Sequence, residues 1–209
     1  MKKLFTSAVI LLLISFSASM FAQGVKIGPR LSGNLNIYNQ DGLTGTWNGV
    51  GIGIGGTVDL SFSPVLGLVT NLTVFDMKNF SNDQTNNNVT TETSLSLAYL
   101  TIDPLFKAEF SGFYMLAGFS VGVKISSSGE RTQSATGQNP VVTTLDLETN
   151  SMKFDIAAGT GYNFKLSETV ALGSDMMVYV PITDTFDFPG TSNSTLSLKL
   201  GVSVKFRIN

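Results

Sequence analysis

The chain has 209 residues, contains no cysteine and no histidine, and carries a formal net charge of −2. Without cysteine, a disulfide scaffold and a lipid-anchored lipoprotein are excluded. Without histidine, most hydrolytic triads and the common zinc sites are excluded. Only 13% of the residues are charged, which is few for a surface that faces water, and no basic stripe indicates nucleic-acid binding.

The first 22 residues have the pattern of a secretory signal peptide. Lys2 and Lys3 precede an apolar run from Leu4 to Phe16, and small residues lead to a predicted cleavage after Ala22. An N-terminal membrane helix is the alternative, but the run is too short to span a bilayer comfortably and no stop-transfer charges follow it. We therefore predict a signal peptide over residues 1–22 and one domain over residues 23–209.

Alternation of apolar and polar residues dominates the chain after this segment. From Val25 to Ile37, the odd positions are almost all apolar, whereas the even positions are polar or glycine. Because successive side chains of a strand point to opposite faces, this pattern predicts a strand with one apolar face. The same pattern predicts seven further strands, at residues 50–62, 66–74, 93–109, 113–125, 152–164, 170–182 and 196–208.

The strand at residues 93–109 is irregular, because its apolar residues change parity part-way along. They pass from Leu95, Leu97 and Tyr99 to Leu100, Ile102 and Phe106. A bulge near Tyr99 and Leu100, or a partly apolar inner face, would each explain the change. In the preceding strand, Val69 and Phe75 also interrupt the alternation.

The charges of the six other strands all lie on the face opposite the apolar one. They are Lys26, Arg30, Asp59, Lys124, Lys153, Asp155, Asp175, Lys199, Lys205 and Arg207. A Lys or Arg in lipid at the bilayer midplane costs about 2–4 kcal/mol, so an uncharged face is typical of a lipid-facing wall. The fold class predicted is all-β: an eight-stranded antiparallel up-and-down transmembrane β-barrel of a bacterial outer membrane.

The connections between these strands alternate in length. Residues 39–49, 78–92, 126–150 and 183–193 form long polar segments, and residues 63–65, 110–112 and 165–168 form short turns. Long outer loops and short periplasmic turns are typical of outer-membrane barrels. A group of phenylalanines at the short-turn end predicts an aromatic girdle: Phe62, Phe106, Phe110, Phe113, Phe164 and Phe206.

The mature sequence resembles the small outer-membrane barrels of Bacteroidetes known as PorT-like or porin-family proteins. The resemblance rests on the segments GVKIGPRLSGNL, LAYLTIDPLFKAEF, FYMLAGFSVGV and LSLKLGVSVKF. The chain departs from many outer-membrane proteins in ending on Asn209 rather than on an aromatic residue. The resemblance implies the barrel fold and the outer membrane more than any activity, and some members are linked to secretion or gliding.

Two motifs are compatible with a catalytic or cofactor site, but a structural interpretation is favoured for each. Gly51, Gly53 and Gly56 match a dinucleotide fingerprint with Asp76 downstream, yet they lie inside an alternating strand with no helix after it. The favoured interpretation is that inner-face glycines leave room for large side chains across the barrel. Inner-face charges such as Lys153, Asp155 and Asp175 would allow Ser-Lys or carboxylate chemistry, but buried opposite charges normally pair with one another.

The predicted loops are acidic. They carry Asp41, Asp83, Glu92, Glu130, Asp146, Glu148, Asp184 and Asp187 against only Lys78 and Arg131. These acids could collect divalent cations or meet a basic partner, but no ligand spacing recurs and ordinary solubility is the preferred interpretation. We predict no catalytic residue, no cofactor and no metal site.

The leading functional hypothesis is a structural or interaction barrel, monomeric and anchored in outer-membrane lipid. Its loops at residues 78–92 and 126–150 would contact an extracellular or envelope protein. A narrow passive channel or a transport- or secretion-associated role is the first alternative, although eight strands leave a lumen that side chains largely fill. Bilayer conductance separates the two hypotheses, and Lys153→Ala should raise conductance if the inner charges plug the lumen. A soluble lipocalin-like binder is the second alternative, and it would need an apolar interior and a polar exterior.

Overall fold

The protein folds into nine antiparallel strands in a computed structural model that describes residues 24–41, 47–86, 88–147, 149–187 and 191–208. The predicted signal peptide lies outside the described residues. The strands are β1 (Val25–Gln40), β2 (Trp47–Ser61), β3 (Leu66–Asn86), β4 (Val89–Phe110), β5 (Phe113–Ala135), β6 (Val141–Leu145), β7 (Met152–Lys165), β8 (Val170–Pro181) and β9 (Asn193–Ile208). No helix in this part of the chain is long and apolar enough to cross a bilayer.

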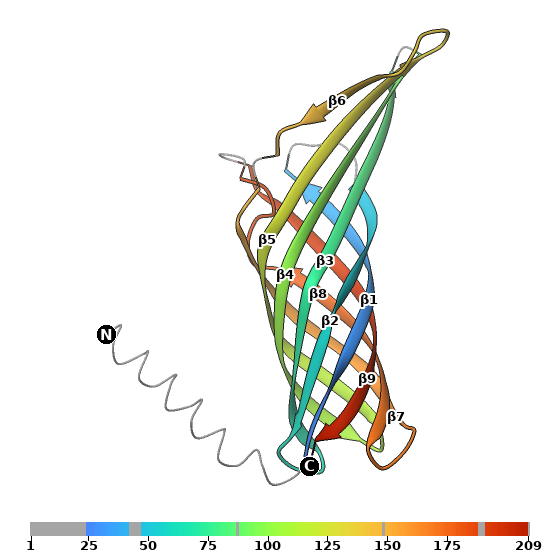
Figure 1. Ribbon diagram of the computed structural model, residues 1–209. Helices are drawn as coiled ribbons and strands as arrows, with labels where there is room; N and C mark the ends of the chain where they lie inside the picture. The colour runs from blue at the N-terminus through green and yellow to red at the C-terminus, as the bar shows by residue number, and fades with distance from the viewer. Residues whose placement is uncertain (1–23, 42–46, 87, 148, 188–190, 209) are drawn as a thin grey trace, which may run out of the picture.

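All strands except β6 close into a ring of eight, as the sequence predicted. Each strand of the ring pairs antiparallel with the next one along the chain, and β1 closes the ring by pairing with β9. Within the described residues, β6 pairs only with the far part of β5. Figure 1 shows the tilted strands, with the C-terminus and the short turns at one end and the long hairpins at the other. A closed ring leaves no unpaired sheet edge in its wall.

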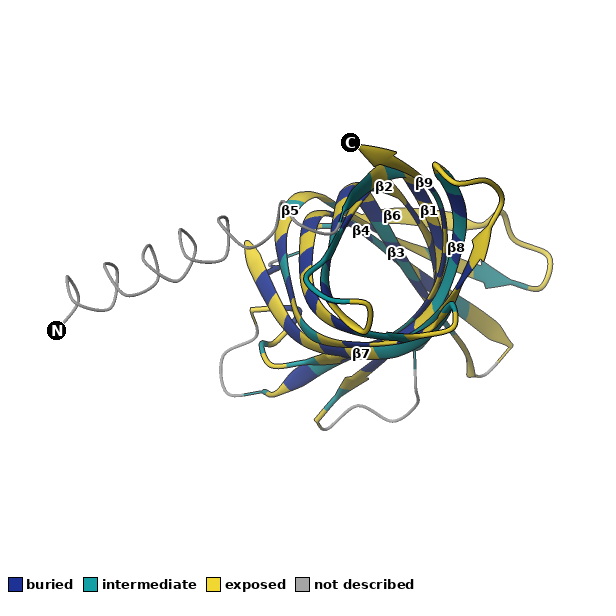
Figure 2. Cartoon of the chain, turned by 90° about the horizontal axis from the view of Figure 1, so that it is seen from below, coloured by how far each residue is buried: buried dark blue, intermediate teal, exposed yellow. Residues whose placement is uncertain are grey.

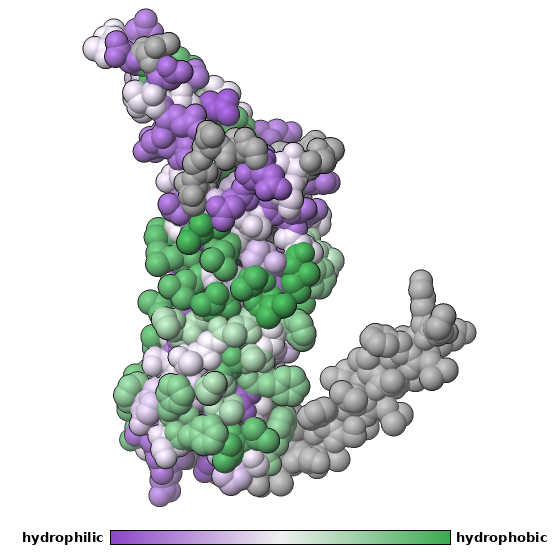
Figure 3. All heavy atoms as spheres, turned by 180° about the vertical axis from the view of Figure 1, so that it is seen from behind, coloured by the Kyte–Doolittle hydropathy of each residue, from purple (hydrophilic) through white to green (hydrophobic). Residues whose placement is uncertain are grey.

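The barrel is polar inside and apolar outside. Inward-facing residues such as Asn36, Asp59 and Lys205 are buried, whereas Leu31, Val50 and Leu200 are more than half exposed. Seen along the axis, buried and exposed residues alternate down each strand (Figure 2). On the face seen in Figure 3, apolar residues cover much of the body of the barrel and hydrophilic residues cover the hairpin end. This distribution is the reverse of that in a soluble ligand-binding barrel, and it confirms the predicted faces.

The parity change around residue 100 comes from the second predicted cause, a partly apolar inner face, and not from a bulge in β4 itself. The odd-numbered residues of β4 face inward without interruption from Thr93 to Lys107, so the inner face is partly apolar. The irregularities lie in the neighbouring strands. In β3, Val74 and Phe75 form a bulge and both point outward, and in β5 an extra residue, Ile125, shifts the register opposite Tyr99. The bulge also explains why Phe75 breaks the alternation of β3.

The prediction that residues 78–92 and 126–150 are loops was wrong for most of their length. β3 and β4 remain paired out to Asn86 and Val89, and β5 runs to Ala135 before the chain returns as β6. We call this part of the structure the hairpin-end sheet (Figure 1). It consists of Ser81–Asn86 of β3, Val89–Ser94 of β4, Gly129–Ala135 of β5 and the whole of β6. Polar residues predominate on both of its faces, so the alternation that reveals a half-buried strand is absent from the sequence.

The short-turn end carries the predicted ring of aromatic residues. Five of the six predicted phenylalanines are exposed on the outer wall, and the sixth, Phe62, is partly buried: Phe106, Phe110, Phe113, Phe164 and Phe206 are the exposed ones. Tyr162 lies among them, with its ring centroid 4.7 Å from that of Phe164. Amphipathic or aromatic rings at this level are typical of the boundary between hydrocarbon and headgroups.

Candidate functional site

The lumen holds four layers of side chains, and the layer nearest the short turns is ionic. Asp59 is fully buried and accepts hydrogen bonds from Lys107 at 2.5 Å and Lys205 at 2.9 Å. Lys107 also pairs with Glu109 at 2.8 Å, and Asn163 bridges Lys205 and Glu109. We call these five residues the lower ion network. Because each buried charge has an opposite partner, the desolvation of the group is offset locally.

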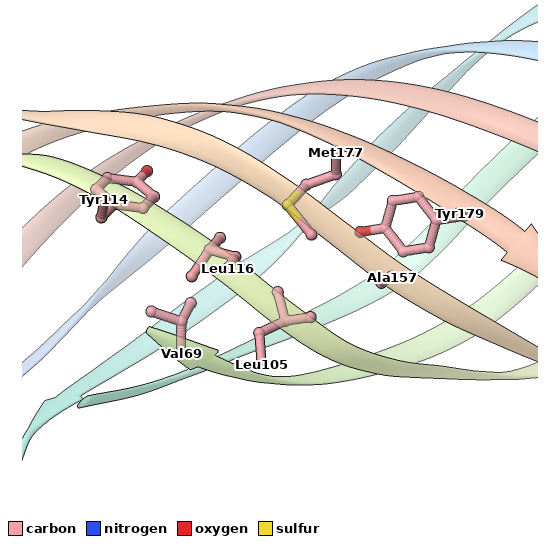
Figure 4. Packing of buried hydrophobic residues seen from close by; sticks show 7 residues of the cluster. All are labelled: Val69, Leu105, Tyr114, Leu116, Ala157, Met177 and Tyr179. Carbon is pink, nitrogen blue, oxygen red and sulfur yellow. The ribbon is translucent and has the colours of Figure 1, made fainter. Parts of the chain in front are cut away.

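The second layer is apolar and is called the central apolar cluster. Its members come from β3, β4, β5, β7 and β8, and they point into the barrel in Figure 4: Val69, Leu105, Tyr114, Leu116, Ala157, Met177 and Tyr179. Val69, which interrupts the alternation of β3 in the sequence, faces inward to join it. Large apolar side chains from several strands therefore fill the bore at this level.

Two polar groups lie against this cluster. Arg30 pairs with Asp175 at 2.5 Å. Asp103 accepts hydrogen bonds from the hydroxyls of Ser120 at 2.6 Å and Tyr179 at 2.9 Å. Both carboxylates thus have hydrogen-bond donors, as buried charges require.

The third layer is the upper polar network. Asp76 pairs with Lys199 at 3.0 Å, and Lys78 donates to Ser197 at 2.5 Å and to Asn36 at 3.3 Å. Its members are Asn34, Asn36, Asp76, Lys78, Ser197 and Lys199. The sequence placed Lys78 in an exposed acidic loop, which was wrong: its side chain is buried inside the barrel.

The fourth layer closes the hairpin end and is called the apolar cap. It consists of Tyr38, Phe80, Leu95, Leu97, Tyr99 and Phe186, with Trp47, Leu145 and Leu147 packed against them. Phe186 comes from the connection between β8 and β9, and its ring lies 5.1 Å from that of Tyr38 in an edge-on arrangement. Asn193 holds this connection in place by accepting from the backbone of Thr185 and Phe186 and donating to the Phe186 carbonyl.

Sequence reasoning missed the cap because no periodic signal marks a connection that folds back into a barrel. Phe186 stands in a segment that the sequence assigned to a polar loop. The one available signal was the aromatic residue itself, since a large apolar side chain is unusual in a solvated loop of a small barrel.

The inner charges named from sequence do not come together as a catalytic group. Lys153 pairs with Asp155 in its own strand at 2.6 Å, whereas Asp175 pairs with Arg30 from β1. The predicted pairing of opposite charges is therefore present, with a partner for Asp175 that the sequence did not indicate.

Two of the dinucleotide-like glycines, Gly51 and Gly53, line the inside of β2, whereas Gly56 belongs to its outward-facing parity. A side chain at Gly51 would meet Asn34 and the Met77 carbonyl, and one at Gly53 would meet Ser32 and Thr73. They leave room for lumen side chains, as the structural interpretation predicted. Asp76 belongs to the upper polar network and pairs with Lys199.

The predicted loop acids are partly gathered on one face of the hairpin-end sheet. Asp83 lies directly opposite Glu92 in the β3–β4 pair, and Glu130 lies opposite Ser94, two residues further along β4. Within the described residues, no group of three or more acidic side chains is arranged to hold a metal ion. Glu148 lies outside the described residues.

The sequence matches the family described as outer membrane protein beta-barrel domain over residues 8–206. The chain belongs to this family. None of the curated proteins compared with it matches.

Solved structures similar to this outer-membrane barrel include Ail, the attachment invasion locus protein of Yersinia pestis, at 12% identity, a TM-score of 0.39, and coverage of 87% of this chain and 98% of Ail. They also include OprG of Pseudomonas aeruginosa, at 9% identity, a TM-score of 0.40, and coverage of 89% of this chain and 96% of OprG. A third is the outer membrane protease OmpT of Escherichia coli, at 6% identity, a TM-score of 0.40, and coverage of 90% and 98%.

Membership of the family places this barrel in the bacterial outer membrane. The short turns and the C-terminus then face the periplasm, and the hairpin-end sheet stands on the extracellular side. The exposed apolar wall is the surface that meets lipid.

Proposed function

We propose that this outer-membrane barrel is a closed structural or interaction protein, anchored by its lipid-facing wall and presenting the hairpin-end sheet to a partner outside the cell. The observation that carries the proposal is the filled lumen. Two apolar layers and two paired polar layers alternate along the bore, so ions would have to cross side chains that are already bonded or packed.

The partner is a protein of the envelope or of the extracellular space, bound by the hairpin-end sheet of one barrel. The sheet extends beyond the wall and carries hydroxyl, amide and acidic side chains, among them Thr91, Glu92, Glu130 and Thr132. Hydrogen-bonding and charged groups of this kind suit a polar interface whose affinity depends on complementary charge. We infer a PorT-like barrel without enzymatic activity, since its inner charges are already paired with one another.

Conductance across a planar lipid bilayer tests the closed lumen. The refolded barrel, checked by its change in gel mobility on heating, should give no stepwise ion currents. Regular current steps from the unaltered protein would contradict the proposal and favour a channel.

Lys153→Ala probes the lumen more finely. The substitution removes the partner of Asp155 and a cation that lies 5.8 Å from the ring centre of Tyr99, but it leaves both apolar layers in place. We therefore expect the variant to stay closed or to show only brief openings in the same bilayer measurement. Sustained currents from this one change would show that the Lys153–Asp155 pair, and not the apolar layers, closes the bore.

A narrow passive channel is the second candidate, and one feature favours it. Thr57, Asn71 and Thr101 have buried polar side-chain atoms without a hydrogen-bond partner among the described residues, and they lie on the inner faces of the adjacent strands β2, β3 and β4. Water would satisfy these atoms, because buried polar groups are normally hydrated when no protein partner is present. Such a hydrated seam would pass small molecules rather than solutes of porin size.

A further inference from the structure

The periplasmic mouth of the barrel contains a pocket that the proposed function does not use. Its volume is about 730 Å³, and it lies between the β4–β5 turn and the β7–β8 turn. Its lining includes three cations, Lys26, Lys165 and Arg207, and its floor reaches Glu109 and Asn163 of the lower ion network. A volume of this size lies within the range of small-molecule sites.

The cations of this mouth pocket repel one another. Lys26 and Arg207 lie directly opposite each other in the β1–β9 pair, and both belong to the inward-facing parity of their strands. Like charges at directly opposed positions destabilise a sheet. A bound anion would turn this repulsion into two attractive contacts.

Two of the nearby carboxylates are already engaged with other cations. Asp59 pairs with both Lys107 and Lys205, and Glu109 pairs with Lys107. Within the described residues, no carboxylate lies within ion-pair distance of Lys26, Lys165 or Arg207, although Glu168 also lines the pocket. The mouth pocket therefore retains a local excess of positive charge.

The wall of the mouth pocket on the lipid side is aromatic. Tyr162 and Phe164 line the pocket and also face outward, where they are 40% and 48% exposed. They belong to the aromatic girdle, which lies at the level of lipid headgroups. An anion that fills the pocket can therefore be joined to an apolar chain that lies against these two rings.

We propose that the mouth pocket binds a phosphate group, and that this phosphate belongs to the headgroup of a phospholipid in the periplasmic leaflet. Lys26, Lys165 and Arg207 contact the phosphate oxygens, and Ser167 and Thr169 of the neighbouring turn supply hydroxyl donors. Cations and hydroxyl groups are the usual ligands of phosphate. The acyl chains lie along Tyr162 and Phe164.

Solution NMR of the refolded barrel in uncharged detergent micelles tests this proposal. The amide signals of Gly112 and Lys165 report on the mouth pocket, and that of Gly129 in the hairpin-end sheet reports on the other end. Micelles would be doped with phosphatidylglycerol or with diacylglycerol, which lacks the phosphate, and inorganic phosphate would be added separately to undoped micelles. We expect saturable shifts at the mouth signals with phosphatidylglycerol only. Equal saturation by inorganic phosphate would overturn the lipid source, and equal shifts with diacylglycerol, or none at all, would overturn the phosphate site.

A pair of single substitutions separates the mouth pocket from general charge effects. Lys165 and Arg131 are both exposed cations, but Arg131 lies in the hairpin-end sheet at the opposite end. Lys165→Gln should weaken phosphatidylglycerol binding about tenfold, the effect of losing one charged hydrogen bond. Arg131→Gln should leave binding unchanged. Equal affinities for the two variants, with both folded by gel mobility, would contradict the assignment.

Discussion

At the scale of single residues, a glycine in the lumen leaves the space that a large side chain from a neighbouring strand occupies. Gly201 on β9 faces the guanidinium of Arg30, which is buried and paired with Asp175. A methyl group at Gly201 would occupy the space of that guanidinium. Gly33, on the outer face of β1, has no atom within 4 Å of the same position. A side chain at the first position would therefore require the Arg30 guanidinium to move, and one at the second would displace nothing.

Gly201→Ala should lower the free energy of unfolding by about 1–3 kcal/mol, the usual penalty for overpacking. Gly33→Ala is its matched control. It should be neutral or slightly stabilising, since alanine has less freedom than glycine in the unfolded chain. Urea unfolding of both variants in the same micelles measures the difference. Similar losses in both would mean that strand propensity, not the position of Arg30, governs these sites.

Asp59 offers a second test at this scale, because it is the shared partner of two buried lysines. Asp59→Asn leaves Lys107 with Glu109 alone and Lys205 without an acidic partner, so we expect a loss of about 3–5 kcal/mol. Glu109→Gln is the control, since it removes an acid whose side chain is 21% exposed while Lys107 keeps Asp59, and it should cost about 1 kcal/mol or less. A milder effect for Asp59→Asn than for Glu109→Gln in urea unfolding would refute the network.

At the scale of elements, the strands of the wall could be predicted from sequence, but their partners inside the barrel could not. Alternation identifies which side of β9 meets lipid, because each strand carries that information by itself. The contact between Arg30 and Asp175 depends on how far each strand is staggered around the ring, and no local pattern records the stagger. The bulge at Val74 and Phe75 was hidden for a similar reason, since it shows only in the pairing with β2 and β4.

The β4–β5 turn permits a test of local turn chemistry. Phe110 and Phe113 pair across a two-residue turn in which Ser111 has φ 53° and Gly112 has φ 90°. Two positive φ angles are typical of a type I′ turn, which prefers Asn-Gly. Ser111→Asn should therefore stabilise the barrel by about 0.5 kcal/mol, whereas Gly112→Ala should destabilise it by about 1–2 kcal/mol.

Gly137 is the control for this turn, because it has a similar φ of 79° but lies in the β5–β6 connection with no atom near its missing side chain. Gly137→Ala strains a segment outside the ring, so the urea midpoint of the barrel should not move. A shift as large as that of Gly112→Ala would mean that the hairpin-end sheet and the ring unfold together.

At the scale of the whole molecule, the sequence predicted the environment better than the function. Few charges and clean strand faces indicate lipid on the outside, and the family match agrees with that inference. The apolar cap could not be foreseen, since Phe186 enters the bore from a connection and only the closed ring brings it against Tyr38. The height of the membrane on the barrel is also a property of the assembled wall, and it leads to a last prediction.

Leu200 and Val142 are both apolar and similarly exposed, at 57% and 61%. We expect Leu200 to face lipid and Val142 to face water. Leu200 lies midway along the outer face of β9, and Val142 lies on β6 in the hairpin-end sheet. In lipid vesicles, Leu200→Arg should lower the free energy of unfolding by about 2–4 kcal/mol, because the charge enters hydrocarbon, whereas Val142→Arg should have almost no effect. Urea unfolding in the vesicles, followed by the fluorescence of Trp47, measures the free energy of unfolding of both variants. Flotation of the vesicles checks that each variant is bound to lipid before unfolding. Equal losses would place β6 in the bilayer as well. If neither variant lost stability, the outer face of β9 would not meet lipid, and the apolar exterior and polar interior of the barrel would need another explanation.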